Sequence, residues 1–374
     1  MAEKIYREMT ETACKDLLVY PKRNLEWKLK NRIKKSLGME YETRDPVNWP
    51  CGLMAAGLSD MAERLSAEEK DGVVKALSAF YDRWIEEDHP LQSLEDTLSG
   101  TALLWLYGES GETRYRRGAH RMVKYLLDHE RDEEGSLPYR PKQKNGYVLS
   151  DMLGMVCPFL TRYAKMAKED PAGAEWDPHT MKSARELACT QIDNFFRYGI
   201  DEESGLPFHG YVTSSGKKLG ITGWGRAVGW VLSGLSSVLE NSGKNSPEYE
   251  RFRKYYEELT GRIWEYQYED GLFGWQLTKY ENEKEKPHAD TSATAMILNA
   301  VCIAERALER RDPAVEERIG RGIDGLKKQI RGGRVMNASA ECLDIGVHPQ
   351  IYGAYPWSLG PSLSLFANAE RNEK

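Results

Sequence analysis

The chain has 374 residues, which guarantees a large core but leaves open whether it forms one domain or two. It is 40% hydrophobic and 29% charged, with a net charge of -6 and a mean hydropathy of -0.63. No apolar stretch reaches the roughly eighteen residues that a membrane span needs. The acidic excess and the lack of a clustered basic face argue against nucleic-acid binding. The charged N-terminus lacks the apolar run of a secretory signal, so we expect a cytoplasmic protein.

The cysteines are scattered along the chain, and none forms a Cys-x-x-Cys pair: they are Cys14, Cys51, Cys157, Cys189, Cys302 and Cys342. This pattern is typical of reduced, buried thiols and not of disulfides or zinc sites. The chain also has no paired-histidine metal motif, no phosphate-binding Gly-rich loop and no Gly-x-Ser-x-Gly elbow. The sequence therefore predicts no metal site.

The hydrophobic pattern has a helical period nearly everywhere, and no alternating strand pattern runs for more than a few residues. Caps and helix breakers predict helices over 3–20, 24–37, 48–64, 67–86, 94–108, 111–129, 148–168, 178–198, 220–241, 246–269, 289–308, 313–331 and 355–369. We therefore expect an all-α protein.

The predicted helices alternate in character. Those near 48–64, 94–108, 148–168, 220–241 and 289–308 are rich in small and apolar residues, and the helices that follow them are dense in Lys, Arg and Glu. We expect the first kind to lie inside and the second kind to face the solvent.

A loop motif of acidic residues, glycine and an aromatic residue recurs at 132–139, 201–208 and 269–275, each time between an outer and an inner helix. Five hairpins, closed by 355–369 inside and by an N-terminal helix outside, predict an (α/α)6 barrel. We expect it to occupy residues 1–374 as one domain. An open α-solenoid is the alternative.

Three predicted inner helices start with an aspartate: Asp96, Asp151 and Asp290. In a barrel of hairpins such positions converge on one mouth. An aspartate at a helix start is also a capping residue, and Ser93 with Asp96 has the pattern of a capping box, so both uses stay open. Asp151 has apolar and aromatic neighbours on both sides. A carboxyl that acts as general acid at neutral pH needs a partner such as Asp96 nearby.

A second cluster spans 224–230, where Arg226 and Trp230 are four residues apart and share a helix face. Such an arginine could grip a carboxylate through a fork of hydrogen bonds while the ring stacks on a sugar. The alternative is a surface arginine over a packing tryptophan. His209 lies in the second repeat loop, where a lone histidine is more often a structural donor than a catalyst.

The stretches 149–160, 205–210 and 224–230 resemble the unsaturated rhamnogalacturonyl hydrolases of glycoside hydrolase family 105 and the related unsaturated glucuronyl hydrolases of family 88. The resemblance implies an (α/α)6 barrel that acts, without a metal or organic cofactor, on the unsaturated uronic acid at the non-reducing end of a small oligosaccharide. It implies that Asp151 protonates C4 of the double bond and then activates water for attack at C5. Asp96 would hold sugar hydroxyls and keep Asp151 protonated.

The same resemblance implies substrate-binding roles for His209, Trp224, Arg226 and Trp230, and we expect Trp49, Arg140 and Tyr352 to join them. The chain departs from the family 105 pattern at 139–140 and around 352–358. The leaving sugar therefore stays open, as does the oligomeric state. Two other functions also stay open: an inverting glycosidase on the same barrel, and a sugar-binding toroid without catalysis.

Overall fold

The computed structural model describes residues 2–19, 25–37, 47–139, 146–170, 176–246 and 248–372. Its α-helices are α1 (Ala2–Val19), α2 (Leu25–Ser36), α3 (Trp49–Ala62), α4 (Ala67–Glu86), α5 (Gly100–Ser110), α6 (Thr113–Asp128), α7 (Asp151–Glu169), α8 (Pro178–Tyr198), α9 (Gly225–Asn241), α10 (Tyr249–Ile263), α11 (Thr291–Ala307), α12 (Pro313–Lys327) and α13 (Pro356–Asn372). Two 3-10 helices are η1 (Leu94–Ser99), which leads into α5, and η3 (Trp264–Tyr266), which follows α10. The strands are β1 (Tyr147–Leu149), β2 (Phe208–Val212), β3 (Lys218–Thr222), β4 (Ile330–Arg331), β5 (Arg334–Val335), β6 (Ala338–Ser339) and β7 (Tyr352–Gly353).

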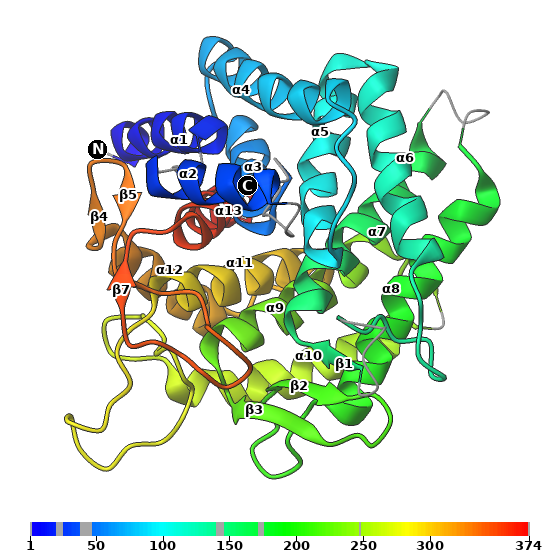
Figure 1. The fold of residues 1–374 in the computed structure, drawn as a ribbon. Helices are drawn as coiled ribbons and strands as arrows, with labels where there is room; N and C mark the ends of the chain where they lie inside the picture. Colours follow the sequence, from blue (N-terminus) through cyan, green and yellow to red (C-terminus); the bar gives the residue numbers. More distant parts are fainter. Residues whose placement is uncertain are drawn as a thin grey trace.

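Six helices form a closed inner ring. Each packs against two neighbours in the order α3, α5 with η1, α7, α9, α11 and α13, and α13 packs back against α3. Helices α4, α6, α8, α10 and α12 each follow an inner helix, while α1 packs on α3, α4 and α13 as the sixth outer helix (Figure 1). The predicted (α/α)6 barrel is confirmed. The contact between α13 and α3 rules out an open solenoid.

The α3–α13 contact that closes the ring depends on two glycines. A Cβ atom on Gly57 would lie 2.2 Å from the carbonyl oxygen of Gly360, and one on Gly360 would lie 2.2 Å from the carbonyl oxygen of Leu53. Real side chains cannot approach a backbone so closely, so only glycine fits at either position. The two helices therefore meet backbone to backbone.

The three repeat loops have the same local structure. Their glycines, Gly135, Gly205 and Gly271, adopt φ of 82°, 70° and 86°, in the left-handed region that favours glycine. Each loop then buries a leucine in the core: Leu137, Leu206 and Leu272. The motif is therefore a tight turn with an apolar anchor, which connects each outer helix to the mouth of the barrel.

A small antiparallel sheet lies at the mouth, where β2 pairs with both β1 and β3. The predicted helices 148–168 and 220–241 were wrong over their first residues, because 147–149 form β1 and 218–222 form β3. Helix α7 begins only at Asp151, and α9 only at Gly225. Figure 1 shows this sheet, β7 and the long loops before α11 and α13 gathered on one side of the barrel.

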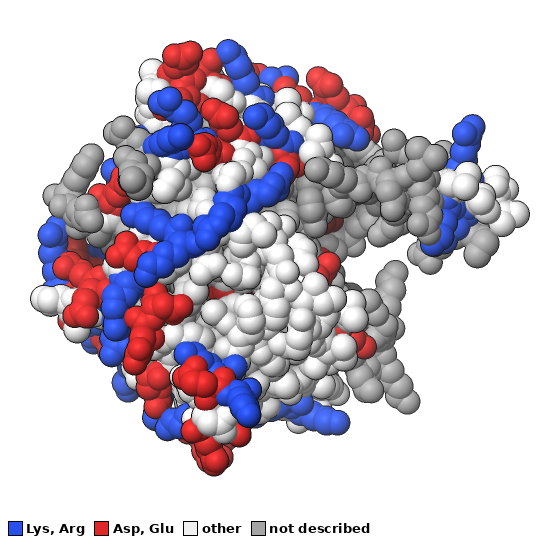
Figure 2. All heavy atoms as spheres, turned by 90° about the vertical axis from the view of Figure 1, so that its left-hand side faces the viewer, with Lys and Arg blue, Asp and Glu red and all other residues white. Residues whose placement is uncertain are grey.

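The surface carries both signs of charge. Figure 2 shows Lys and Arg side chains interspersed with Asp and Glu over one face, beside a broad uncharged area. Among the helices of the described ranges, none combines the length and the apolar character needed to cross a membrane.

Candidate active site

Strand pairing brings Asp151 to His209. Strand β1 leads directly into Asp151, and it pairs with β2 so that Leu149 lies opposite Gly210, while the Ser150 amide donates to the His209 carbonyl at 2.8 Å. As a result His209 Nε2 lies 3.6 Å from Asp151 Oδ2, and the Ser150 hydroxyl donates to the same carboxylate oxygen at 3.1 Å. A carboxyl and an imidazole thus face each other at the mouth.

His209 is almost fully buried, with 2% of its surface exposed. Burial lowers the pKa of its imidazole, and the Asp151 carboxylate only partly opposes this effect. The ring is therefore neutral near pH 7. It packs at 4.5 Å from the Trp224 ring and 5.7 Å from the His348 ring, and its Nδ1 has no hydrogen-bond partner among the described residues.

Asp96 is buried, and its carboxylate serves the local backbone. Its Oδ2 accepts hydrogen bonds from the amides of Gln92 and Ser93 at 2.8 and 3.0 Å. Because 94–99 is a 3-10 helix, Asp96 turns back onto the start of its own helix. The capping use that the sequence left open is thus the one that the structure displays.

The neighbouring Glu95 faces the mouth instead. Tyr139 Oη donates to Glu95 Oε1 at 2.9 Å, and the Tyr139 ring stacks on Tyr147. The pKa of Glu95 is raised to about 7, chiefly by burial and in smaller part by the negative charges of Asp151, Asp96 and Glu341, while the hydrogen bond from Tyr139 opposes the rise. Glu95 was absent from our predicted site, although it is adjacent to Asp96 in sequence.

Arg226 takes part in a buried network and not in an open clamp. Its guanidinium donates to the Ser339 carbonyl and hydroxyl and to the Ala340 carbonyl, and it lies 3.8 Å from Asp290 Oδ2. Asp290 is fully buried and accepts hydrogen bonds from Ser292 and from Ser339. In this structure Arg226 therefore fixes β6 and the loop that follows it over the mouth.

The remaining predicted residues lie at different depths. Trp49 is half-buried and packs 5.1 Å from Trp357, whereas Trp224 and Trp230 are each 2% exposed. Trp224 also packs under the Arg226 guanidinium. Tyr352 is half-buried on β7, stacked on His288 at 3.8 Å. Arg140 lies outside the described residues.

The loop between β6 and β7 adds two groups that the sequence reasoning missed. Glu341 is exposed to solvent and accepts a hydrogen bond from Trp49. The His348 ring lies 5.0 Å from Trp224 and 5.6 Å from Trp275, and burial lowers its pKa to about 4. No local sequence pattern predicts that these two groups lie at the mouth, because the loop is held in place by the distant Arg226. Among the described residues no cluster of three or more His, Cys, Asp or Glu is placed to hold a metal ion.

The helical barrel is consistent with the protein family that the sequence matches. The family model "Glycosyl Hydrolase Family 88" matches residues 23–348. The chain therefore belongs to glycosyl hydrolase family 88, and it is a glycoside hydrolase.

Individual relatives are similar to this chain along most of its length. An unsaturated rhamnogalacturonyl hydrolase, YesR from Bacillus subtilis (strain 168), is 22% identical over 357 residues, which cover 91% of this chain and 94% of the relative. A family 105 glycoside hydrolase from C. acetobutylicum ATCC 824 superposes with a TM-score of 0.71 at 20% identity, over 92% of this chain and 99% of its own. The unsaturated glucuronyl hydrolase from Bacillus sp. GL1 gives a TM-score of 0.63 at 16% identity, over 98% of this chain and 97% of its own. These two structures support the barrel fold.

Proposed function

We propose that this enzyme is an unsaturated uronyl hydrolase. Asp151 transfers its proton to C4 of the C4=C5 double bond, and the positive charge that forms at C5 is shared with the ring oxygen. Water then adds to C5 and returns a proton to the Asp151 carboxylate, so that the net change is addition of water across the double bond. The product is a hemiketal, which opens and releases the next sugar.

The observation that carries this proposal is the pairing of Asp151 with a neutral His209 at an aromatic mouth. The neutral imidazole faces the carboxyl group that transfers the proton, and it brings no positive charge to it. Glu95 is the neighbouring carboxyl group in the role that we expected of Asp96, because the Asp151 charge acts on it. Trp49, Tyr139 and Tyr147 offer aromatic surface for the sugar.

The experiment that tests the proposal follows the ultraviolet absorbance of the conjugated unsaturated uronate during incubation with lyase-generated disaccharides. We expect the absorbance to fall with the wild-type enzyme and to stay constant with Asp151→Asn, with a rate loss of about a thousandfold or more. A saturated disaccharide of the same sugars serves as the control, because an inverting glycosidase would cleave it and a hydratase would leave it intact. Cleavage of the saturated substrate would overturn the proposal.

The substrate class and the location are part of the same proposal. The name of the B. subtilis relative supports rhamnogalacturonan fragments from pectin as the first substrates to test, with glycosaminoglycan disaccharides as the second panel. All six cysteines are free thiols, which fits a reducing cytoplasm.

A further inference from the structure

The barrel contains a cavity at the end opposite to Asp151. It has a volume of about 670 Å³, within the roughly 300–1,000 Å³ of small-molecule sites. Leu53, Leu98, Gly154, Trp230 and Met296 line its inner end, and it extends to the C-terminal ends of the inner helices. We call it the axial cavity. It is formed by all six inner helices and shares no lining residue with the Asp151–His209 pair.

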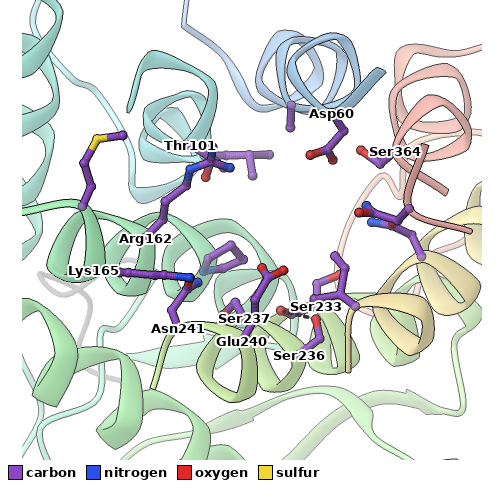
Figure 3. Close-up of a pocket in the computed structure, with 18 of the residues that line it drawn as sticks. Asp60, Thr101, Arg162, Lys165, Ser233, Ser236, Ser237, Glu240, Asn241 and Ser364 are labelled. Atoms are coloured by element: carbon purple, nitrogen blue, oxygen red, sulfur yellow. Dashed lines mark hydrogen bonds between the residues drawn. The ribbon is translucent and has the colours of Figure 1, made fainter. Parts of the chain in front are cut away.

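The walls of the axial cavity carry polar groups among apolar ones. They carry hydroxyl and amide side chains that suit a polyhydroxylated ligand: Thr101, Ser233, Ser236, Ser237, Asn241, Asn299, Ser364 and Asn368. The buried hydroxyl oxygen of Thr101 has no hydrogen-bond partner in the described part of the chain. Figure 3 shows these walls surrounding an open space.

Two cations of α7 point into this space. Arg162 and Lys165 are three residues apart, so they project from the same side of the helix. Figure 3 shows both side chains extending from α7 into the cavity, and both are half-buried. Over the described ranges, neither has an ion-pair or hydrogen-bond partner. Half-buried cations without an ion-pair partner are suited to bind an anion.

Among the described residues, none of the four acidic side chains of the cavity is ion-paired with Arg162 or Lys165. Glu240 is paired with Arg306 at 2.7 Å, Asp170 accepts hydrogen bonds from Tyr107 and Trp176, and Asp60 has a partner of its own. Glu169 is exposed at the rim. The C-terminal ends of the helices add negative potential, which Arg162 and Lys165 offset locally.

We propose that the axial cavity is a second binding site, for a small polyhydroxylated anion: a sugar whose carboxylate or phosphate is held by Arg162 and Lys165. The hydroxyl and amide groups of the wall bind the sugar hydroxyls. The site is independent of the chemistry at the mouth, so it stands whether or not the hydratase proposal is correct.

The test is equilibrium binding by calorimetry at low salt with three probes: D-galacturonate, D-glucose 6-phosphate and neutral D-galactose. We expect at least one anionic sugar to bind and galactose to bind at least tenfold more weakly; which anion binds distinguishes carboxylate from phosphate. Arg162→Gln and Lys165→Gln should each weaken binding of that anion about tenfold or more, because each removes a charge-assisted contact. Ser233→Leu should abolish binding by filling the cavity while leaving both charges in place.

Matched controls separate this site from others. Lys168→Gln removes an exposed charge from the same helix outside the axial cavity and should leave the affinity unchanged. His209→Ala alters the mouth and should also leave it unchanged. The proposal is overturned if neither anion binds, if His209→Ala and not the α7 variants removes binding, or if folded Ser233→Leu protein binds as the wild type does.

Discussion

At the scale of single residues, the site depends on which of two adjacent acids faces the mouth. The sequence pointed to Asp96, because its spacing from Ser93 and its place at a helix start are visible in one chain segment. The structure turns Asp96 onto backbone amides and leaves Glu95 beside Tyr139. Adjacent residues in a 3-10 turn point in different directions. The helical period of the sequence does not predict which of the two acids faces the mouth. Asp151, in contrast, could be predicted from its apolar and aromatic neighbours, whereas a role for His209 was implied only by the family resemblance.

Glu95 gives a prediction about stability and pH. Burial raises its pKa from 4.5 to about 7, so the unfolded chain releases the proton at lower pH than the folded protein does. The protein should therefore lose stability as pH rises from about 4.5 to about 7, and that loss should persist at higher pH. Glutamine cannot ionise. We expect Glu95→Gln to melt a few degrees higher than wild type above pH 7, with the difference shrinking towards pH 5.

Melting curves on both sides of pH 7 check this prediction. Glu203→Gln, an exposed charge loss in the second repeat loop, is the control and should show no such trend with pH. If the difference in melting temperature between Glu95→Gln and wild type is the same at every pH, the carboxyl is solvated and not buried.

At the scale of elements, the helices were the part that sequence could predict. Helix α4 starts after its N-cap Ser66, and α8 starts at Pro178 after its N-cap Asp177, and both predicted ranges match the observed ones. The strands were missed because β1 has three residues and finds its partner in a distant loop. So short a segment has no measurable period. The position of Asp151 against His209 depends on that pairing and could not be predicted locally.

The link between α9 and β6 gives a second prediction. Arg226 reaches Ser339 and Ala340 through a planar fork of donors, which a lysine ammonium cannot reproduce. We expect Arg226→Lys to free the loop between β6 and β7, so that protease cleaves it faster and kcat/KM falls about tenfold or more. Limited proteolysis and steady-state kinetics measure the two effects.

Arg251→Lys is the matched control, because Arg251 forms a similar two-pronged contact with Asp193 on the outer layer, where it is exposed. That variant should keep wild-type cleavage and kinetics. An Arg226→Lys enzyme with an equally resistant loop would show that the loop is held by other contacts.

The α3–α13 seam gives a third prediction. In Gly360→Ala the new methyl group meets the Leu53 carbonyl, and the two helices must separate, at a cost of about 1–3 kcal/mol of unfolding free energy. In Gly72→Ala, on the exposed side of α4, the methyl group meets nothing within 4 Å and should stabilise the helix by up to about 1 kcal/mol. Denaturant unfolding of both variants measures the difference. Equal effects would mean that the seam can relax.

At the scale of the whole molecule, closure of the ring ties every hairpin to two others. We predict that residues 1–374 behave as one domain and unfold in a single cooperative transition. Scanning calorimetry should give one peak with equal calorimetric and van't Hoff enthalpies. Two resolved peaks would indicate separately folding units. The alternation of apolar and charged helices and the number of hairpins predicted a closed barrel. The backbone-to-backbone contact that closes it could not be predicted, because no local pattern reports that Gly57 and Gly360 meet.

The same seam has a consequence for how the protein is made. Helix α3 leaves the ribosome early, whereas its partner α13 is the last described helix to be synthesised. Until then the nascent chain holds a row of inner helices with an uncovered apolar edge at each end, a state prone to aggregation. The final step of folding therefore waits for the final helix. A chain stalled before Pro356 should remain bound to chaperones that recognise exposed apolar segments, long after most of its helices have formed.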